Sequence, residues 1–344
     1  MVVAAAGAIA GVLLGTSPHH GATPVPSAAP LSAPRSTAPL DHAAPAALNG
    51  YTIVYTGSKG VRSVAFGGHG ESDLPTGPAS RPVQAAGDVV FMHAGNAYVL
   101  VPPFSGPPRA LASGEALFPM LWPDMVGVVS GVGPGGRTIR FVDVDTGVTS
   151  DTLSWFLPPG YEPVSQFLVA GPGGALRSWS AGHSGSAELG PVLGHAGAVL
   201  GASSTEVAWL AAAGCAAGGE CPLHLTATGS SRSDRTVPPA PGRAGFLPGG
   251  ALSPDGRLLA TFVAAPAAGR GQAELAIVDT ENLTVTVVAA SAVAAGPSGA
   301  TAQWTPDGLA VFFCGHAGSM HVYWPGDARA ITLGLPASNS FTLG

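Results

Sequence analysis

The chain has 344 residues, of which 50 are glycine and 33 are proline, about twice the ordinary share of these two residues together. Only 10% of the residues are charged, Lys59 is the single lysine and the net charge is -6, which excludes a lysine-rich binder of nucleic acid. A hydrophobic fraction of 46% excludes a disordered chain and predicts a folded core with frequent turns.

The N-terminal segment, residues 1–16, contains an uncharged run at positions 2–14 (VVAAAGAIAGVLL). This run is shorter than the roughly 20 residues that span a bilayer, and it matches the apolar region of a signal peptide better. A signal peptide ordinarily begins with positive charges, which are missing here. We expect a truncated signal or membrane-anchor segment that has lost residues upstream of Met1, and a buried apolar strand is the alternative.

Residues 17–50 are rich in proline and alanine (SPHHGATPVPSAAPLSAPRSTAPLDHAAPAALNG). Proline fixes φ and removes backbone donors, so this run favours extended conformers over a packed element. We expect a disordered linker, in which His19 and His20 are solvated. The linker would hold a folded domain, residues 51–344, away from a membrane.

After position 50 no stretch shows the 3.6-residue period of a helix, because Gly or Pro interrupts every candidate window. Short β-rich runs of five to seven residues occur instead. They lie at 51–55, 88–92, 96–101, 125–129, 138–144, 258–263, 274–279, 283–288, 309–313 and 320–324.

Two copies of one turn motif indicate internal repeats. Residues 251–262 (ALSPDGRLLATF) contain Ser253, Pro254, Asp255 and Gly256, and residues 303–313 (QWTPDGLAVFF) contain Thr305, Pro306, Asp307 and Gly308. Pro presets φ, Asp bonds its own backbone and Gly allows φ > 0, so each motif predicts a tight hairpin before a strand. A weaker copy lies at 121–130 (LWPDMVGVVS), and similar third-strand endings lie at 141–147 (FVDVDTG) and 277–283 (IVDTENL).

These turns and strand endings resemble the repeats of TolB-like or WD40-like β-propellers of bacterial envelope proteins. The resemblance is good over 251–333 and degenerate over 51–250, and the Trp-Asp ending of true WD40 repeats is absent. It implies an all-β propeller of six to seven four-stranded antiparallel blades, with seven favoured. Residues 51–70 could supply one blade, closed by pairing with a C-terminal strand.

Cys215 and Cys221 lie in a Gly-rich connection (GCAAGGECPLH) and predict a disulfide in an exported chain. A metal site of Cys215, Cys221 and His224 is the sharper alternative, although this spacing matches no standard zinc pattern, and free thiols are the third. We expect Cys314 to be a small buried hydrophobe.

Other chemical motifs are weak. Residues 131–136 (GVGPGG) have dinucleotide-loop spacing but precede a strand, so we expect a hairpin loop. Residues 296–300 (GPSGA) fail the nucleophile pattern, and His316 and His321 lack a third ligand. The six tryptophans, spread along the chain, suit packing between blades. They are Trp122, Trp155, Trp179, Trp209, Trp304 and Trp324.

We therefore expect an extracytoplasmic, non-enzymatic binding or sensing module, without cofactor, catalytic residues or metal. Its partner would be a protein or small-molecule ligand at the channel face of the propeller, and its N-terminal segment would contact the membrane. The alternative is an exported propeller enzyme, such as a lyase or quinoprotein-like oxidoreductase, with its site in the central channel. A third reading is the sensor half of a longer membrane protein.

Overall fold

Short apolar runs bounded by Gly and Pro form β-strands in the computed structural model. Its central strands, such as β6 (Asp88–His93), β17 (Glu206–Ala211) and β21 (Leu258–Ala264), are buried along nearly their whole length. Such strands lie between two neighbouring sheets, which explains why their sequences are continuously apolar. The structure describes residues 35–36, 46–57, 60–66, 70–74, 82–85, 87–102, 106–120, 124–133, 136–147, 155–156, 161–164, 167–170, 174–181, 187–203, 205–216, 219–227, 233–265, 271–295, 300–338 and 340–343.

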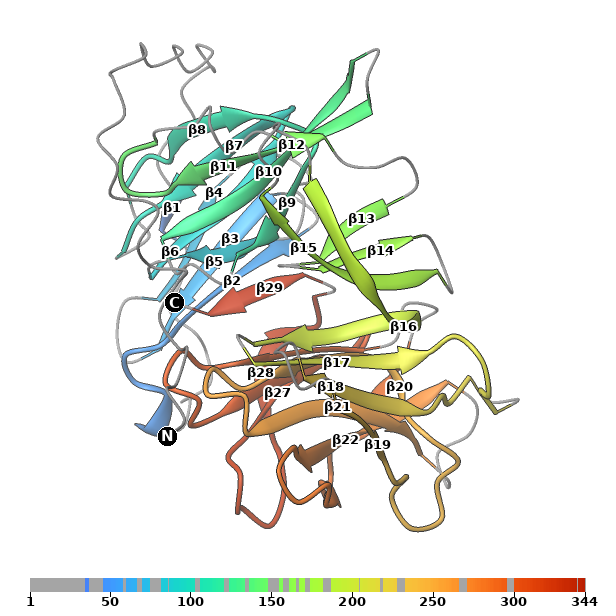
Figure 1. Ribbon diagram of the computed structural model, residues 1–344. Coiled ribbons are helices and arrows are strands. Elements are labelled where there is room, and N and C mark those ends of the chain that lie inside the picture. The colour runs from blue at the N-terminus through green and yellow to red at the C-terminus, as the bar shows by residue number, and fades with distance from the viewer. Residues whose placement is uncertain are drawn as a thin grey trace, which may run out of the picture.

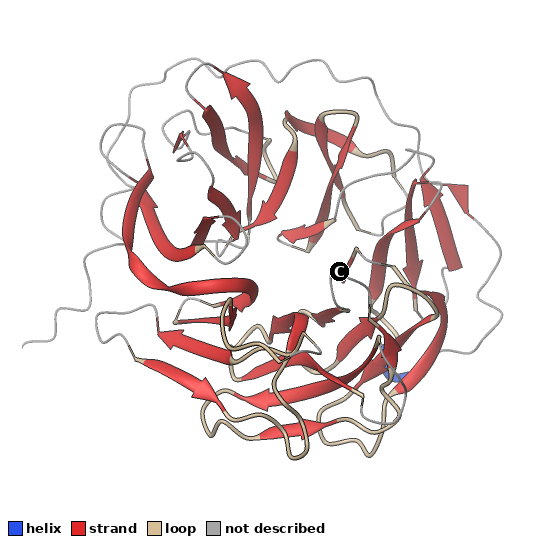
Figure 2. Ribbon diagram, turned by 90° about the vertical axis from the view of Figure 1, so that its right-hand side faces the viewer, coloured by secondary structure: helices blue, strands red, loops and turns tan. Residues whose placement is uncertain are grey.

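The strands form antiparallel sheets in chain order around a ring (Figures 1 and 2). The N-terminal sheet contains β1 (Arg35–Ser36), β2 (Thr52–Gly57), β3 (Gly60–Ala65) and β4 (Gly70–Leu74). The next contains β5 (Val83–Ala85), β6, β7 (Asn96–Leu100) and β8 (Arg109–Ser113). The third contains β9 (Ala116–Pro119), β10 (Met125–Gly133), β11 (Gly136–Asp143) and β12 (Trp155–Phe156).

A seven-stranded sheet follows. Its strands are β13 (Tyr161–Val164), β14 (Phe167–Ala170), β15 (Ala175–Ala181), β16 (Ala187–Ala202), β17, β18 (Leu223–Ala227) and β19 (Asp234–Val237). The fifth sheet contains β20 (Leu247–Leu252), β21, β22 (Gln272–Asp279), β23 (Val285–Val287) and β24 (Val293–Ala294). The sixth contains β25 (Thr301–Trp304), β26 (Val311–Cys314), β27 (Ser319–Tyr323) and β28 (Ile331–Pro336).

The favoured count of seven separate blades is not supported, because the described strands join into six sheets. β16 is the cause: its first half pairs with β15 and its second half with β17, so two four-stranded sets share one strand. Between the pairs Arg177↔Val192 and Trp179↔Leu189, two residues of β16 oppose one of β15. Pro191 lies in this bulge. The bulged residues are outside the regular strand pairing, so the missing backbone N–H of a proline is tolerated there and the strand continues through it.

The ring closes through the C-terminal strand β29 (Phe341–Leu343), which pairs with β2 and makes the N-terminal sheet five-stranded. The expected blade near residues 51–70, closed by a C-terminal strand, is therefore present. A buried apolar cluster supports the closure, with Ile53 and Tyr55 from one end of the chain and Phe312, Phe341 and Leu343 from the other.

Some residues that precede position 51 also contact the described domain. Leu48, in the 3₁₀ turn η1 (Ala46–Leu48), is fully buried in the closure cluster, and Arg35–Ser36 pairs with β4 as an added edge strand. η1 is the only helical element of the described residues. The predicted signal or anchor segment, residues 1–16, and the rest of the linker lie outside the described residues. Within the described part of the chain, no helix is long and apolar enough to cross a membrane.

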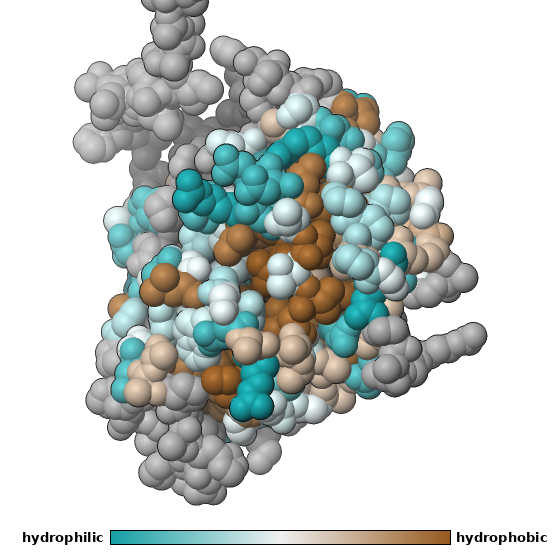
Figure 3. Space-filling view, turned by 90° about the horizontal axis from the view of Figure 1, so that it is seen from below, coloured by the Kyte–Doolittle hydropathy of each residue, from teal (hydrophilic) through white to brown (hydrophobic). Residues whose placement is uncertain are grey.

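The rim of the ring is less buried than the interior of the sheets. In β28 the side chains alternate largely between exposed and buried, and in β23 Thr286 is exposed between two half-buried valines. Figure 3 shows the molecule from below, and on this face hydrophobic residues form a band that is bordered by hydrophilic residues. The outer strands therefore leave part of their apolar area accessible to solvent.

Candidate functional site

The turns between first and second strands, and between third and fourth strands, emerge at the same end of the ring, because successive strands are antiparallel. We call this end the turn face. Ser253–Pro254–Asp255–Gly256 connects β20 to β21, and Thr305–Pro306–Asp307–Gly308 connects β25 to β26. The two repeat motifs therefore occupy corresponding turns of neighbouring sheets.

Both motifs close their turns with the same hydrogen bonds. The amide of Leu258 donates to Ser253 Oγ, and the amide of Ala310 donates to Thr305 Oγ1, each over 2.9 Å. Gly256 and Gly308 have φ values of 74° and 73°, which favour glycine. The hydroxyl residue at the start of each turn is buried and satisfies an amide that would otherwise be unpaired.

The aspartates of these turns are held as carboxylates. Hydrogen bonds from the Ser253 hydroxyl and then from the Arg257 amide lower the pKa of Asp255. Burial alone would raise the pKa of Asp307, but hydrogen bonds from Tyr51, Thr305 and the Leu309 amide outweigh it, so this pKa is also lowered.

A third turn of this kind, at Ser203, was not recognised from the sequence. Ser203 Oγ accepts the Glu206 amide over 3.1 Å, and the Ser203 amide donates to the Glu206 carbonyl over 2.8 Å. The turn lacks Pro, Asp and Gly, so the signal available was the Ser-Ser-Thr run before β17.

The three turns contact one another around the ring. A Cβ on Gly256 would lie 3.3 Å from Ser203 Oγ, and a Cβ on Gly308 would lie 3.4 Å from Pro254. Across the closure, the Tyr51 hydroxyl donates to Asp307. The inner part of the turn face is thus one continuous arc from Ser203 to Tyr51.

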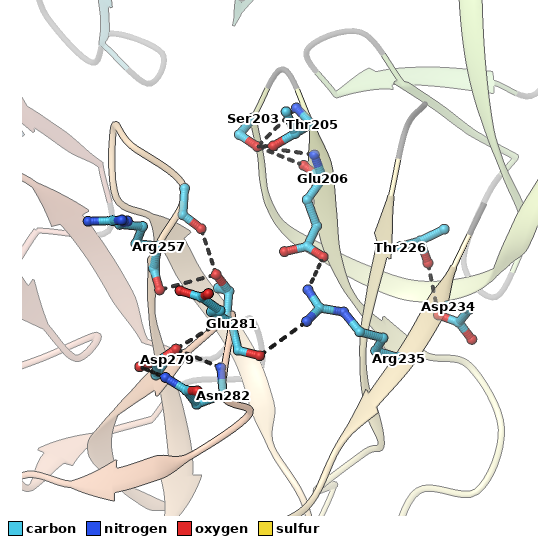
Figure 4. Close-up of polar contacts among 12 residues, drawn as sticks. Ser203, Thr205, Glu206, Thr226, Asp234, Arg235, Arg257, Asp279, Glu281 and Asn282 are labelled. Carbon is cyan, nitrogen blue, oxygen red and sulfur yellow. Dashed lines mark hydrogen bonds and ion pairs between the residues drawn. The ribbon is translucent and has the colours of Figure 1, made fainter. Parts of the chain in front are cut away.

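Charged side chains extend this arc outward (Figure 4). Arg235 Nη2 lies 2.6 Å from Glu206 Oε1, and Arg235 Nη1 lies 3.5 Å from the Glu281 carbonyl of the neighbouring sheet. Asp279 ends β22, and the amide and then the side chain of Asn282 lower its pKa by hydrogen bonding. The pair Glu206–Arg235 therefore lies between two sheets, beside an ordered outer turn.

His224 belongs to a network within one sheet. Trp209 Nε1 donates to Thr226 Oγ1, which donates to Asp234 Oδ1, and His224 Nδ1 lies near Asp234 Oδ2; each distance is 2.9 Å. The His224 ring stacks on Trp209 with centroids 4.4 Å apart. These contacts join β17, β18 and β19.

Cys215 and Cys221 form the expected disulfide, with Cα atoms 4.0 Å apart, well below the separation of about 7 Å above which two cysteines cannot be bridged without backbone movement. This bond overturns the alternative metal site with His224, because both sulfurs are used. Among the described residues, no group of three or more His, Cys, Asp or Glu is placed to hold a metal ion.

The remaining sequence candidates are not brought together. His316 Nδ1 lies 3.1 Å from the Ala294 carbonyl, whereas His321 stacks on Phe313 and faces Thr332. Burial lowers the pKa of His321. Cys314 is buried, its thiol donates to the Ser338 carbonyl over 3.0 Å, and burial raises its pKa to about 11.

The glycine-rich motif at 131–136 contributes the end of β10 and the start of β11, so its described residues open no helix. Trp304 connects two sheets, since its Nε1 donates to the Ala251 carbonyl over 2.8 Å. Residues 121–123, with Trp122, and residues 296–299 lie outside the described part, as do the side chains of Trp155 and Trp179.

No protein-family model and no curated protein matches the chain. Among solved structures, the β-propeller domain of the Trilobed protease from Pyrococcus furiosus, which has an open velcro topology, is similar with a TM-score of 0.55 and 10% identity, covering 88% of this chain and 96% of that one. An oligogalacturonate lyase in complex with manganese has a TM-score of 0.50 and 12% identity, with 82% and 83% covered.

TolB from Acinetobacter baumannii has a TM-score of 0.47 and 12% identity, covering 85% of this chain and 82% of that one. The first two likenesses, at 10% and 12% identity, show only a shared architecture. Together with the six sheets arranged in a ring, the likeness to the propeller domain of the Trilobed protease establishes that the chain has the β-propeller fold expected from its repeats.

Proposed function

We propose that this protein is an extracytoplasmic, non-enzymatic binding module whose turn face docks a protein partner. The observation that carries the proposal is the continuous arc from Ser203 to Tyr51, in which turns of successive sheets are capped internally and contact each other. A surface built in this way is already ordered before binding, which reduces the entropy lost on association.

The innermost strands also support binding rather than chemistry. Neighbouring sheets contact one another through their first strands: β5, β9, β13, β20, β25, β29 and the second half of β16. Apart from Glu162 in β13, those strands consist of small, apolar or uncharged polar residues, such as Gly249, Gly250 and Gln303. A Cβ on Gly249 would lie 1.9 Å from the Ala300 carbonyl oxygen, so glycine allows the close approach of two sheets near the ring axis.

Site-specific photo-cross-linking in cells of the natural host tests the proposal. Leu309 follows Asp307-Gly308 on the turn face and is 63% exposed, whereas His316 is exposed in a turn at the opposite end. A photoreactive residue at 309 is expected to capture a discrete partner that the same residue at 316 does not capture. Capture of the same species from both ends, or of none from position 309, would refute docking through the turn face.

A charge substitution supplies a matched control. Leu309→Glu should weaken binding of the captured partner at least tenfold, while His316→Glu should leave it unchanged. The enzyme alternative predicts instead a small-molecule ligand in the channel, with binding that is insensitive to Leu309→Glu.

The extracytoplasmic location is a separate proposal supported by the disulfide, since such bonds persist in oxidising compartments. Protein lysed from its host in denaturant, without reductant and with an excess of a thiol-blocking reagent, should carry one blocked thiol per chain, that of Cys314. Three blocked thiols would place the protein in a reducing compartment and overturn this part of the proposal.

A further inference from the structure

The Cys215–Cys221 disulfide lies at the end of the ring opposite the turn face, in the connection between β17 and β18. Cys215 is exposed and Cys221 is half-buried. A solvent-exposed disulfide sulfur is accessible to an attacking thiolate, and access is one of the factors that set the rate of thiol–disulfide exchange.

The residue before the second cysteine reaches the neighbouring sheet. Glu220 is only 8% exposed, and its Oε1 accepts the amide of Ala264, at the end of β21, over 3.3 Å. Burying a carboxylate is unfavourable unless it is well compensated, and this long hydrogen bond is its single described one. The covalent link at Cys221 restrains the adjacent Glu220 in this position.

Two further contacts join the same three segments. The backbones of Cys221 and Phe246 exchange two hydrogen bonds, of 2.7 and 2.9 Å, and Phe246 is fully buried. Arg243, in the connection that leads to β20, pairs with Glu274, which lies opposite Val263 in the β21–β22 ladder. We call this set of contacts, with Glu220 and the disulfide, the disulfide junction.

Two backbone hydrogen bonds hold the described part of the loop that the disulfide closes. Within it, the described backbone hydrogen bonds are Ala216 N–H to the Glu220 carbonyl, 2.6 Å, and Gly219 N–H to the Ala216 carbonyl, 2.9 Å. Phe246 is held by the core independently of the loop, so opening the disulfide would free the loop and Glu220 without unfolding the sheet.

We propose that the Cys215–Cys221 disulfide is a site of thiol–disulfide exchange with a dithiol reductant, and that its state controls the contact between Glu220 and the neighbouring sheet. A reductant thiolate attacks Cys215 Sγ, forming a mixed disulfide and releasing the Cys221 thiolate, which takes up a proton. The second reductant thiol, once deprotonated, attacks the mixed disulfide. The products are two protein thiols and the oxidised reductant, so two electrons pass to the protein. In the reduced state the loop opens and Glu220 moves into solvent.

The test compares amide hydrogen exchange of the whole folded chain before and after incubation with dithiothreitol under native conditions. We expect reduction without loss of the fold, and at least tenfold faster exchange of the amides of Ala264, Ala216 and Gly219. The amides paired between β17 and β18 should be unchanged. Reduction only at denaturant concentrations that unfold the ring, or equal Ala264 exchange in both states, would overturn the proposal, as would faster exchange throughout β17 and β18.

Variants distinguish a local effect of the disulfide junction on amide exchange from a general loss of stability. Cys215→Ser with Cys221→Ser should reproduce the exchange pattern of the reduced protein, and the wild-type measurement stands if this variant does not fold. In Glu220→Ala the Ala264 amide should exchange rapidly in both redox states. Cys314→Ala is the thiol control, and it should respond to dithiothreitol like the wild type because Cys314 lies outside the junction.

Discussion

Asp88, the first residue of β6, is a buried carboxylate with no hydrogen bond to the described residues. Burial raises its pKa, repulsion by Asp145 raises it further and Arg109 opposes these effects. The Arg109 guanidinium donates to the carbonyls of Val144 and Asp145 and makes no described hydrogen bond to either carboxylate. Ionised Asp88 therefore destabilises the folded state.

We predict that Asp88→Asn stabilises the protein at neutral pH. Because the pKa of Asp88 is raised in the folded state, its contribution to the stability of the wild-type protein is fully present below the ordinary aspartate pKa. This stability is lost as pH rises through the raised pKa. The variant should gain roughly 1 kcal/mol at pH 7, and this gain should shrink in acid. Urea denaturation at pH 4 and pH 7.5 measures it. Asp145→Asn should give a smaller gain of the same sign, and a gain for Asp88→Asn that grows in acid would contradict the argument.

Tyr51 and Asp307 show how one residue pair joins distant parts of the chain. Burial and then the hydrogen bond to Asp307 raise the pKa of Tyr51, while the same bond contributes to lowering that of Asp307. The lowered carboxyl pKa contributes stability that is present above the ordinary aspartate pKa and is lost as pH falls.

Tyr51→Phe should therefore lower the free energy of unfolding by roughly 0.5–1.5 kcal/mol at pH 7, and by less in acid. Denaturation at pH 7 and pH 3 measures both values. Tyr323→Phe is the control, because the Tyr323 hydroxyl donates over 3.3 Å to the backbone carbonyl of Asp327, four residues away, and does not cross the closure. An equal effect of the two substitutions, or one that is independent of pH, would show that the closure bond has no special role.

At the scale of elements, the sheets are stabilised by side-chain networks as well as by backbone ladders. The chain of contacts from Trp209 through Thr226 to Asp234 and His224 connects three adjacent strands. Thr226 is the central member, because its buried hydroxyl both accepts and donates.

Thr226→Val should lower the free energy of unfolding by roughly 1–3 kcal/mol, because it leaves the buried Trp209 Nε1 without its acceptor. Guanidinium denaturation followed by tryptophan fluorescence measures the loss. Thr236→Val, at an exposed position of β19, has the same change of shape and should be close to neutral. Similar losses for both would indicate an effect of strand propensity and not of the network.

For the whole molecule, the decisive element is β29, since three C-terminal residues complete the N-terminal sheet. The closure also includes the Ser338 hydroxyl, which donates to the Thr56 carbonyl over 3.1 Å. Phe341 and Leu343 bury their side chains almost completely in the closure cluster.

Ending the chain at Ser338 should remove roughly 3–6 kcal/mol, the burial of two large apolar side chains, and this is a large share of an ordinary domain's stability of about 5–15 kcal/mol. Differential scanning calorimetry should show a lower and broader transition. A chain that ends at Leu343 keeps all of β29 and is the control. An unchanged transition in the shorter chain would mean that the ring is stable when open.

Local chemistry determined much of this protein from its sequence: short strands, the turns at Ser253 and Thr305, and the Cys215–Cys221 bond all depend on residues within a few positions of one another. The tertiary structure decided what depends on distant partners. β16 pairs with β15 and with β17 through different halves, with Pro191 in a bulge, and so joins two strand sets into one sheet. The Ser203 turn is local but had only the Ser-Ser-Thr run as its signal. The Tyr51–Asp307 bond across 256 positions and the Glu220–Ala264 contact carry no local signature, because each exists only once neighbouring sheets have packed around the ring.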